Sequence, residues 1–88
     1  MELARVHQAL QQRIFTRLML EGVTIVDPAQ TVIDSRARIC ADTIIEPFTT
    51  IAGAAEIGRD CRIGPHAHLG PHARIPDGTR VLPFTAIG

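Results

Sequence analysis

Between residues 33 and 87 an aliphatic residue falls at every sixth position without a break. This aliphatic column consists of Ile33, Ile39, Ile45, Ile51, Ile57, Ile63, Leu69, Ile75, Val81 and Ile87. A second column, of small residues, follows four places later: Ala37, Thr43, Thr49, Ala55, Cys61, Ala67, Ala73, Thr79 and Thr85. Neither a helix nor a simple strand has this period, so it indicates a repeat architecture.

Six residues suffice for one short strand and one turn. If each unit turns the chain by about a third of a circle, three units make one coil, and successive coils stack as parallel strands about 4.8 Å apart. The aliphatic column then fills a triangular prism, and the small column lies near its corners. A sandwich would need strands spaced by roughly 8–12 residues. A buried helix would not tolerate the six prolines and seven glycines, all of which follow residue 21. We therefore predict an all-β solenoid of about three coils, covering residues 33–50, 51–68 and 69–86.

Turn-forming residues recur at fixed places in the repeat. Pro stands two places after the aliphatic residue at Pro47, Pro65, Pro71 and Pro83, which suits the first central position of a type II turn. The next position then requires a positive φ angle. It holds tolerant residues at Asp42, Asp60, His66, His72 and Gly78, and less suitable ones at Arg36, Phe48, Ala54 and Phe84.

The residues before the repeat predict an amphipathic helix from residue 2 to about 20, ended by Gly22. Its apolar stripe consists of Leu3, Val6, Leu10, Ile14 and Leu18, widened by Phe15 and Met19. We expect this helix to cover one end of the solenoid or to pack against a symmetry mate, since its polar face is not rich in lysine as a membrane-surface helix would be. Residues 23–26 predict a short strand, and the gap of seven from Val26 to Ile33 indicates one extra residue in the first turn. The predicted domains are a linker or capping helix at 1–22 and the solenoid at 23–88.

The composition limits the classes of binding partner and the cellular location that we expect. The formal net charge is zero and no basic run exists, so nothing favours nucleic acid or a membrane surface. No signal peptide or long apolar run is present, which predicts a cytoplasmic protein. Cys40 and Cys61 fall on different columns of the repeat, so we expect no disulfide between them.

The hexads resemble the left-handed parallel β-helix of the hexapeptide-repeat transferases, and the left hand is an implication of that resemblance. Residues 19–28, with the segment GVTIVDP, resemble more narrowly one junction in a bacterial family. It is the passage from linker helix to β-helix in the bifunctional N-acetylglucosamine-1-phosphate uridyltransferases/glucosamine-1-phosphate acetyltransferases, which make UDP-N-acetylglucosamine. The resemblance covers nearly the whole chain. It implies a homotrimer, and it implies acetyl-CoA and Mg for the full-length enzymes.

The departures from that family matter as much. Its uridyltransferase domain would precede Met1, its acetyltransferase residues lie in later coils, and the nine basic residues here are all arginine, with no lysine. No catalytic residue of either half can be carried over, no cofactor-binding residue can be assigned, and we expect this chain to bind no cofactor. The resemblance therefore predicts a trimerising β-helix module without activity by itself. Two alternatives stay open: a small acyl-CoA-dependent acyltransferase with an intersubunit site, and a carbonic-anhydrase-like trimer with a metal held by histidines.

His66, His68 and His72 invite the metal hypothesis. In the repeat, however, His66 and His72 occupy neighbouring corners and His68 points outward from a face, so we predict no metal site within one chain. We expect no catalytic histidine either.

The stacking rule reveals a different feature, because Phe48, His66 and Phe84 recur every eighteen residues along one corner. This predicts a ladder of rings, each pair worth about 0.5–1.5 kcal/mol. We favour a structural interpretation, in which the stacked rings make successive coils more rigid. The functional alternative is that the ladder forms a trimer contact or a groove for a ligand. The remaining candidates, Arg59, Arg62, Arg74 and Arg80, are predicted to be outward charges.

A solenoid this short buries little apolar surface in one chain. We therefore expect a homotrimer formed through flat prism faces, with end-to-end stacking at the open coil near Gly88 as a further contact.

Overall fold

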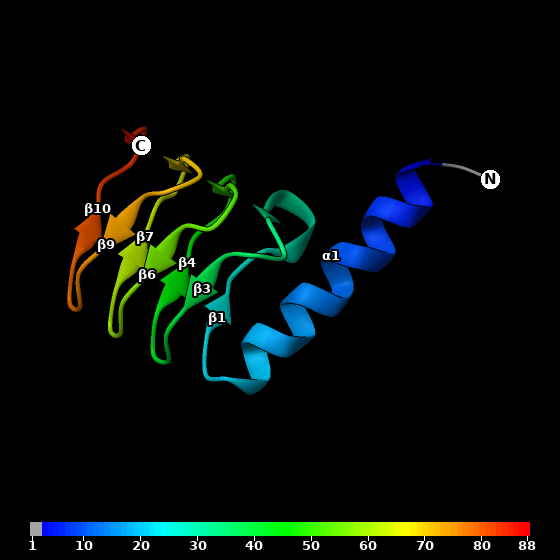
Figure 1. The fold of residues 1–88 in the computed structure, drawn as a ribbon, viewed down its shortest axis with the longest axis horizontal. Helices are drawn as coiled ribbons and strands as arrows, with labels where there is room; N and C mark the ends of the chain where they lie inside the picture. The colour runs from blue at the N-terminus through cyan, green and yellow to red at the C-terminus, as the bar shows by residue number, and fades with distance from the viewer. Residues whose placement is uncertain (1–2) are drawn as a thin grey trace.

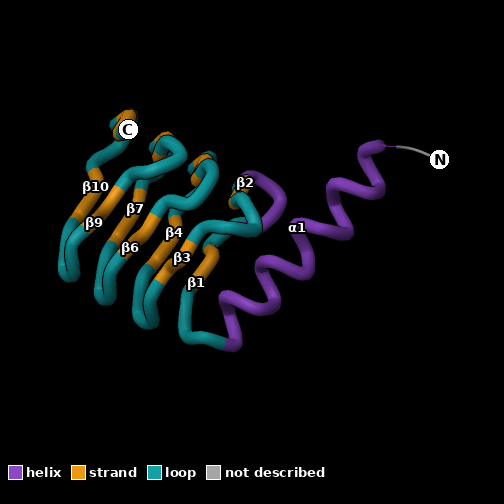
Figure 2. Tube along the Cα trace, viewed as in Figure 1, coloured by secondary structure: helices purple, strands orange, loops and turns teal. Residues whose placement is uncertain are grey.

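The structure, a computed structural model, describes the backbone of residues 3–88 and the side chains of residues 8–88. Helix α1 (Leu3–Leu20) leads into a solenoid, and the described part of the chain measures 41 × 25 × 21 Å (Figures 1 and 2). The strands are all two residues long: β1 (Thr24–Ile25), β2 (Val32–Ile33), β3 (Arg38–Ile39), β4 (Ile44–Ile45), β5 (Thr50–Ile51), β6 (Glu56–Ile57), β7 (Arg62–Ile63), β8 (His68–Leu69), β9 (Arg74–Ile75), β10 (Arg80–Val81) and β11 (Ala86–Ile87).

The strands form three parallel sheets, one on each side of a prism. Sheet A has the order β1-β4-β7-β10, sheet B the order β2-β5-β8-β11, and sheet C the order β3-β6-β9. Partners in the repeat are eighteen residues apart, as in Ile33↔Ile51. This confirms the predicted parallel solenoid. It has about four turns instead of about three, because β1 joins sheet A ahead of the regular repeat.

The first turn corrects one prediction. Ile25, which is 6% exposed, points inward, whereas Val26 is 53% exposed. Ile25 pairs with Ile45, twenty residues along the chain, so the first turn carries two extra residues and not one. A short 3-10 helix, η1 (Pro28–Gln30), accommodates them. Asp27 caps this helix, since its Oδ1 accepts a hydrogen bond from the Ala29 backbone N at 3.2 Å.

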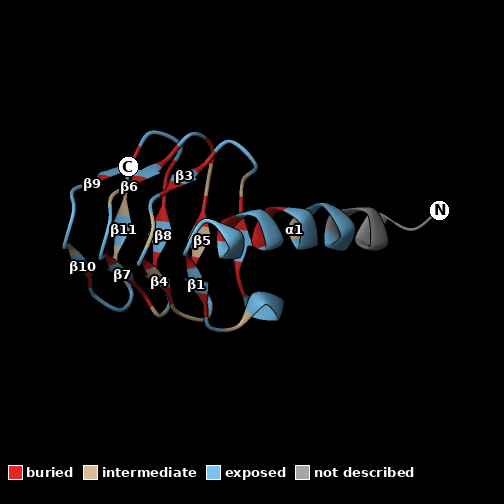
Figure 3. Cartoon of the chain, turned by 90° about the horizontal axis from the view of Figure 1, so that it is seen from below, coloured by how far each residue is buried: buried red, intermediate tan, exposed pale blue. Residues whose placement is uncertain are grey.

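The core is the interior of the prism (Figure 3, red). Every predicted member of the aliphatic column is buried except Ile87, which is partly buried. The small column is buried from Ala37 to Ala73, and Thr79 and Thr85 are half-buried. Two locked columns in the sequence thus translate directly into one continuous apolar core.

Two of the three corners of the prism have a positive φ at the predicted turn position, and the third corner does not. In the corner between sheets A and B, and in the corner between sheets C and A, the predicted position has a positive φ. These residues are Phe48, His66 and Phe84 in the first corner, and Asp42, Asp60 and Gly78 in the second. In the corner between sheets B and C the prediction is wrong, because Arg36, Ala54 and His72 have no positive φ. There Gly53, one position earlier, takes a φ of 54° instead.

Helix α1 covers the first coil by packing against β1 and β2. Ile14, Phe15 and Leu18 are buried, whereas Leu10 remains 53% exposed. Met19, also predicted for the stripe, is 44% exposed, and Leu3 and Val6 lie outside the described side chains. Gly22, with a φ of 96°, ends the helix as predicted, since the two backbone bonds of a Schellman motif close it: Gly22 N to Met19 O and Val23 N to Leu18 O. Among the described residues no helix is both long and apolar enough to cross a membrane.

Candidate functional site

The predicted ring ladder is present at the corner between sheets A and B. The His66 ring stacks on Phe48 with 4.8 Å between centroids and 6° between planes, and on Phe84 with 4.8 Å and 10°. All three residues are exposed, Phe84 at 79%. We call these three residues the aromatic ladder.

The ladder occupies an unfavourable backbone position. Its residues have φ angles of 60°, 56° and 61°, a conformation that bulky residues adopt at a cost of about 1–3 kcal/mol each. The equivalent position in the corner between sheets C and A holds Asp42, Asp60 and Gly78, which tolerate positive φ far better. The turn geometry therefore does not require large rings at these positions. Their presence indicates that contacts made by the ring surfaces offset the cost of the backbone conformation.

Other apolar side chains surround the ladder. Val26 and Leu82, both more than half exposed, lie in the same corner. We call Val26, Phe48, Leu82 and Phe84 the apolar edge. Next to it, the outward strand positions of sheet B carry no Arg, Asp or Glu: they are Val32, Thr50, His68 and Ala86. The edge adjoins this face, and the charged residue at the corner position that Val26 and Leu82 share is Glu46, which is half-buried and paired with Arg62.

The other two faces carry the charged residues. On sheet A, Arg62 Nη2 lies 2.8 Å from Glu46 Oε1. On sheet C, Arg74 Nε lies 3.6 Å from Glu56 Oε2. Arg59 and Arg80 are also exposed, so the four arginines predicted to be outward are all outward. The sequence interpretation did not pair them, although the eighteen-residue stacking rule would have found Arg74 opposite Glu56.

The histidines do not converge. His66 is held in the ladder, His68 projects from β8, and His72 is exposed at the next corner. Among the described side chains no group of three or more His, Cys, Asp or Glu residues is suited to holding a metal. Cys40 is exposed and Cys61 is buried, and both are free thiols.

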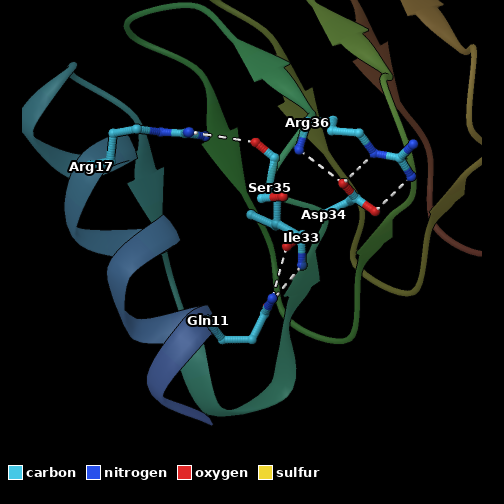
Figure 4. Close-up of polar contacts among 6 residues, drawn as sticks. All are labelled: Gln11, Arg17, Ile33, Asp34, Ser35 and Arg36. Carbon is cyan, nitrogen blue, oxygen red and sulfur yellow. Dashed lines mark hydrogen bonds and ion pairs between the residues drawn. The ribbon is translucent and has the colours of Figure 1, made fainter. Parts of the chain in front are cut away.

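The junction between helix and solenoid contains contacts that the sequence interpretation missed (Figure 4). Gln11 bonds both backbone groups of Ile33: its Nε2 donates to the carbonyl O at 2.8 Å and its Oε1 accepts from the N at 3.0 Å. Arg17 Nη1 donates to the Ser35 carbonyl at 3.5 Å. No spacing rule in the sequence marks Gln11, because its partner is the backbone of Ile33 in β2 and a backbone contact does not depend on the side-chain type.

Asp34 and Arg36 form a local ion pair beside this junction (Figure 4). The Arg36 Nε lies 3.1 Å from Asp34 Oδ1, and the Arg36 backbone N donates to the same oxygen at 2.8 Å. The side-chain bond from Arg36, followed by its backbone bond, lowers the pKa of Asp34 from 3.8 to about 2. The pair orders the turn after β2.

Comparison with known proteins agrees with this geometry. Residues 36–71 match the family described as bacterial transferase hexapeptide (six repeats), whose repeat implies a left-handed coil. The bifunctional protein GlmU of Fervidobacterium nodosum is 50% identical over 62 residues, which is 70% of this chain and 14% of that protein. GlmU of Limosilactobacillus reuteri is 40% identical over 83 residues, 94% of this chain and 18% of that protein.

The chain thus spans less than a fifth of the length of these relatives. The family match, at residues 36–71, lies within the repeat that builds the solenoid described above. Residues 36–71 thus carry the bacterial transferase hexapeptide repeat, and the chain is related to the β-helix region of GlmU.

Proposed function

We propose that this chain is a homotrimerising β-helix module, related to the enzymes that make UDP-N-acetylglucosamine and without transferase activity by itself. The observation that carries the proposal is the continuous surface formed by the apolar edge and the uncharged face of sheet B. Large exposed apolar patches on a soluble protein commonly mark contact sites, and Phe84 is 79% exposed.

The shape of this surface fits a closed ring of three copies. A threefold interface is heterologous, which means that one surface patch of each copy meets a different patch of the next. Two different neighbouring patches are available, the apolar edge and the sheet B face. Sheet C offers no alternative of this kind, because its outward column is Arg38, Glu56 and Arg74. Burying those charges would cost free energy unless each found a partner.

A pair of matched variants tests the interface. Thr50 and Thr24 both occupy the outward position of a two-residue strand, Thr50 on sheet B and Thr24 on sheet A. Thr50→Arg places a charge in the proposed contact and is expected to yield monomers by size-exclusion chromatography with light scattering. Thr24→Arg is expected to leave the assembly unchanged. Equal effects of the two variants would contradict the proposed interface.

The proposed lack of activity is supported by the separation of the histidines and by the absence of lysine. A general base needs hydrogen-bond reach to the proton it removes and a site that holds the substrate, and no described histidine faces such a site. Incubation of the chain with acetyl-CoA and glucosamine 1-phosphate should give no acetylated product. Turnover would favour the acyltransferase alternative, and stoichiometric zinc in the same sample would favour the metal alternative.

A cytoplasmic location without nucleic-acid or membrane partners is part of the same proposal. Cell fractionation would test it, with recovery in the membrane pellet as the contrary result.

A further inference from the structure

Strands β1, β2 and β3 are each the first strand of their sheet, so each has one edge that no neighbouring strand pairs with. At β2 a side chain of α1 bonds the backbone groups of this edge. In β2, Val32 N and Asp34 N donate to Thr49 O and Ile51 O of the next coil. The N–H and C=O of Ile33, which lies between them, therefore point the opposite way. Gln11 satisfies both groups with its amide (Figure 4). The edge of β2 is thus protected against pairing with another strand.

Strand β3 pairs with the next coil in the same way as β2, but no described side chain bonds its free edge. Arg38 N donates to Ala55 O at 2.9 Å and Cys40 N to Ile57 O at 3.0 Å. The N–H and C=O of Ile39 consequently face away from β6. No hydrogen bond among the described residues ends on either group. Helix α1 packs against β1 and β2, and its residues Arg17 and Leu18 line a groove together with β3.

A groove of about 810 Å³ runs along this free edge. Arg17 and Leu18 of α1, with Glu21 just after the helix, line one side of it, and residues 35–40, including Ile39, line the other. Arg17 is only loosely paired, with 4.0 Å between its Nε and Glu21 Oε1. Arg36, by contrast, is already paired with Asp34.

The charges of sheet C indicate what would fit there. The outward column alternates Arg74, Glu56, Arg38 along the sheet, with 3.6 Å between Arg74 Nε and Glu56 Oε2. A strand added beyond β3 would place a side chain opposite Arg38. An acidic residue there continues the alternation, and opposite charges on neighbouring strands are favourable.

We propose that the free edge of β3 docks an extended acidic peptide segment of a partner protein by strand addition. One peptide residue bonds the N–H and C=O of Ile39, as Gln11 bonds those of Ile33, and an Asp or Glu of the segment faces Arg38. Main-chain bonds then supply affinity and the alternating side chains supply specificity. The site goes beyond the proposed assembly, because sheet C is not part of the proposed interface and stays accessible in the trimer.

Amide hydrogen exchange measured by NMR tests this on the full chain. In the free protein the Ile33 amide should be protected by Gln11, and the Ile39 amide should exchange faster. The probe is a capped hexapeptide of alternating Val and Glu. At ten times its Kd, exchange at Ile39 should slow about tenfold. The same peptide N-methylated at alternate residues should leave Ile39 unchanged, because it has lost the donors for strand pairing.

Charge variants supply the specificity test. Arg38→Glu should weaken binding of the Val–Glu peptide about fivefold and favour its Val–Lys counterpart. Arg80→Glu, on sheet A, is the matched control and should have no such effect. The proposal is overturned if Ile39 is already as protected as Ile33, if N-methylation makes no difference, or if the two variants behave alike. Protection of Ile39 that rises with protein concentration alone would also overturn it, since a second copy would then fill the edge.

Discussion

Thr43 and Thr49 occupy successive positions of the small column, yet their hydroxyl groups have opposite surroundings. Both are buried, with exposures of 0% and 1%. Thr43 Oγ1 donates to the Gly58 carbonyl at 2.7 Å and accepts from the Cys61 backbone N at 3.3 Å. Thr49 Oγ1 has no hydrogen-bond partner among the described residues. Valine has nearly the shape of threonine, so replacing each tests the hydroxyl alone.

Thr43→Val should lower the stability, and Thr49→Val should not. Thr43→Val leaves the buried N–H of Cys61 and the part-buried carbonyl of Gly58 without their partner, at a cost of about 1–3 kcal/mol. Thr49→Val removes a buried hydroxyl that has no partner, so the variant should be as stable as the parent or more stable by about 1 kcal/mol. In a domain of this size, 1 kcal/mol corresponds to a shift in Tm of about 4–8 °C.

Thermal unfolding followed by circular dichroism measures this difference. All three proteins must be compared at one concentration, because assembly makes Tm concentration-dependent. We expect Thr43→Val to lower Tm and Thr49→Val to hold or raise it. A loss of Tm in Thr49→Val as large as that in Thr43→Val would refute the reasoning, since it would mean that the Thr49 hydroxyl is satisfied in solution.

Two further predictions concern the turns. Gly53 and Gly78 both have positive φ, but a Cβ on Gly53 would lie 2.7 Å from the Pro71 Cβ, whereas one on Gly78 meets nothing within 4 Å. Gly78→Ala should therefore cost about 1 kcal/mol of unfolding free energy, the penalty of the φ angle alone, and Gly53→Ala clearly more; equal losses in urea unfolding would contradict the close contact. The pKa of Asp34 is lowered from 3.8 to about 2, so its stabilising contribution is full above the unfolded value and is lost as the pH falls from near 4 toward 2. An NMR titration of the Asp34 carboxyl should have its midpoint near 2, and Arg36→Gln should move it upward; an unchanged midpoint in that variant would show that Arg36 is not the cause.

The periodic part of the fold was predictable because the interior of a narrow prism accepts only one kind of residue at each position. Ile45 and Ile63 fall in register because nothing else fits between the sheets. The same rule predicts the contact between Phe48 and His66, whose rings stack in the structure. Residues that obey the eighteen-residue repeat could therefore be positioned from the sequence alone.

The errors lie where the repeat is interrupted or where several backbones satisfy the same composition. The first turn was misread because Ile25 and Val26 are both aliphatic, and only pairing with β4 decides which one points inward. The corner between sheets B and C was misread because Gly53 takes the positive φ expected of Ala54. Gln11 was missed because it bonds backbone, which leaves no pattern in side-chain types. The candidate contact surface was only partly foreseen, since exposure of Leu82 depends on the corner geometry.

The mass of the unmodified chain in solution tests the central claim most directly. Sedimentation equilibrium at micromolar concentration should give a single species with three times the 9.6 kDa mass of one chain. A single species of 9.6 kDa under the same conditions would contradict the account. The chain would then be a stable monomer, with the apolar edge and the sheet B face exposed to solvent.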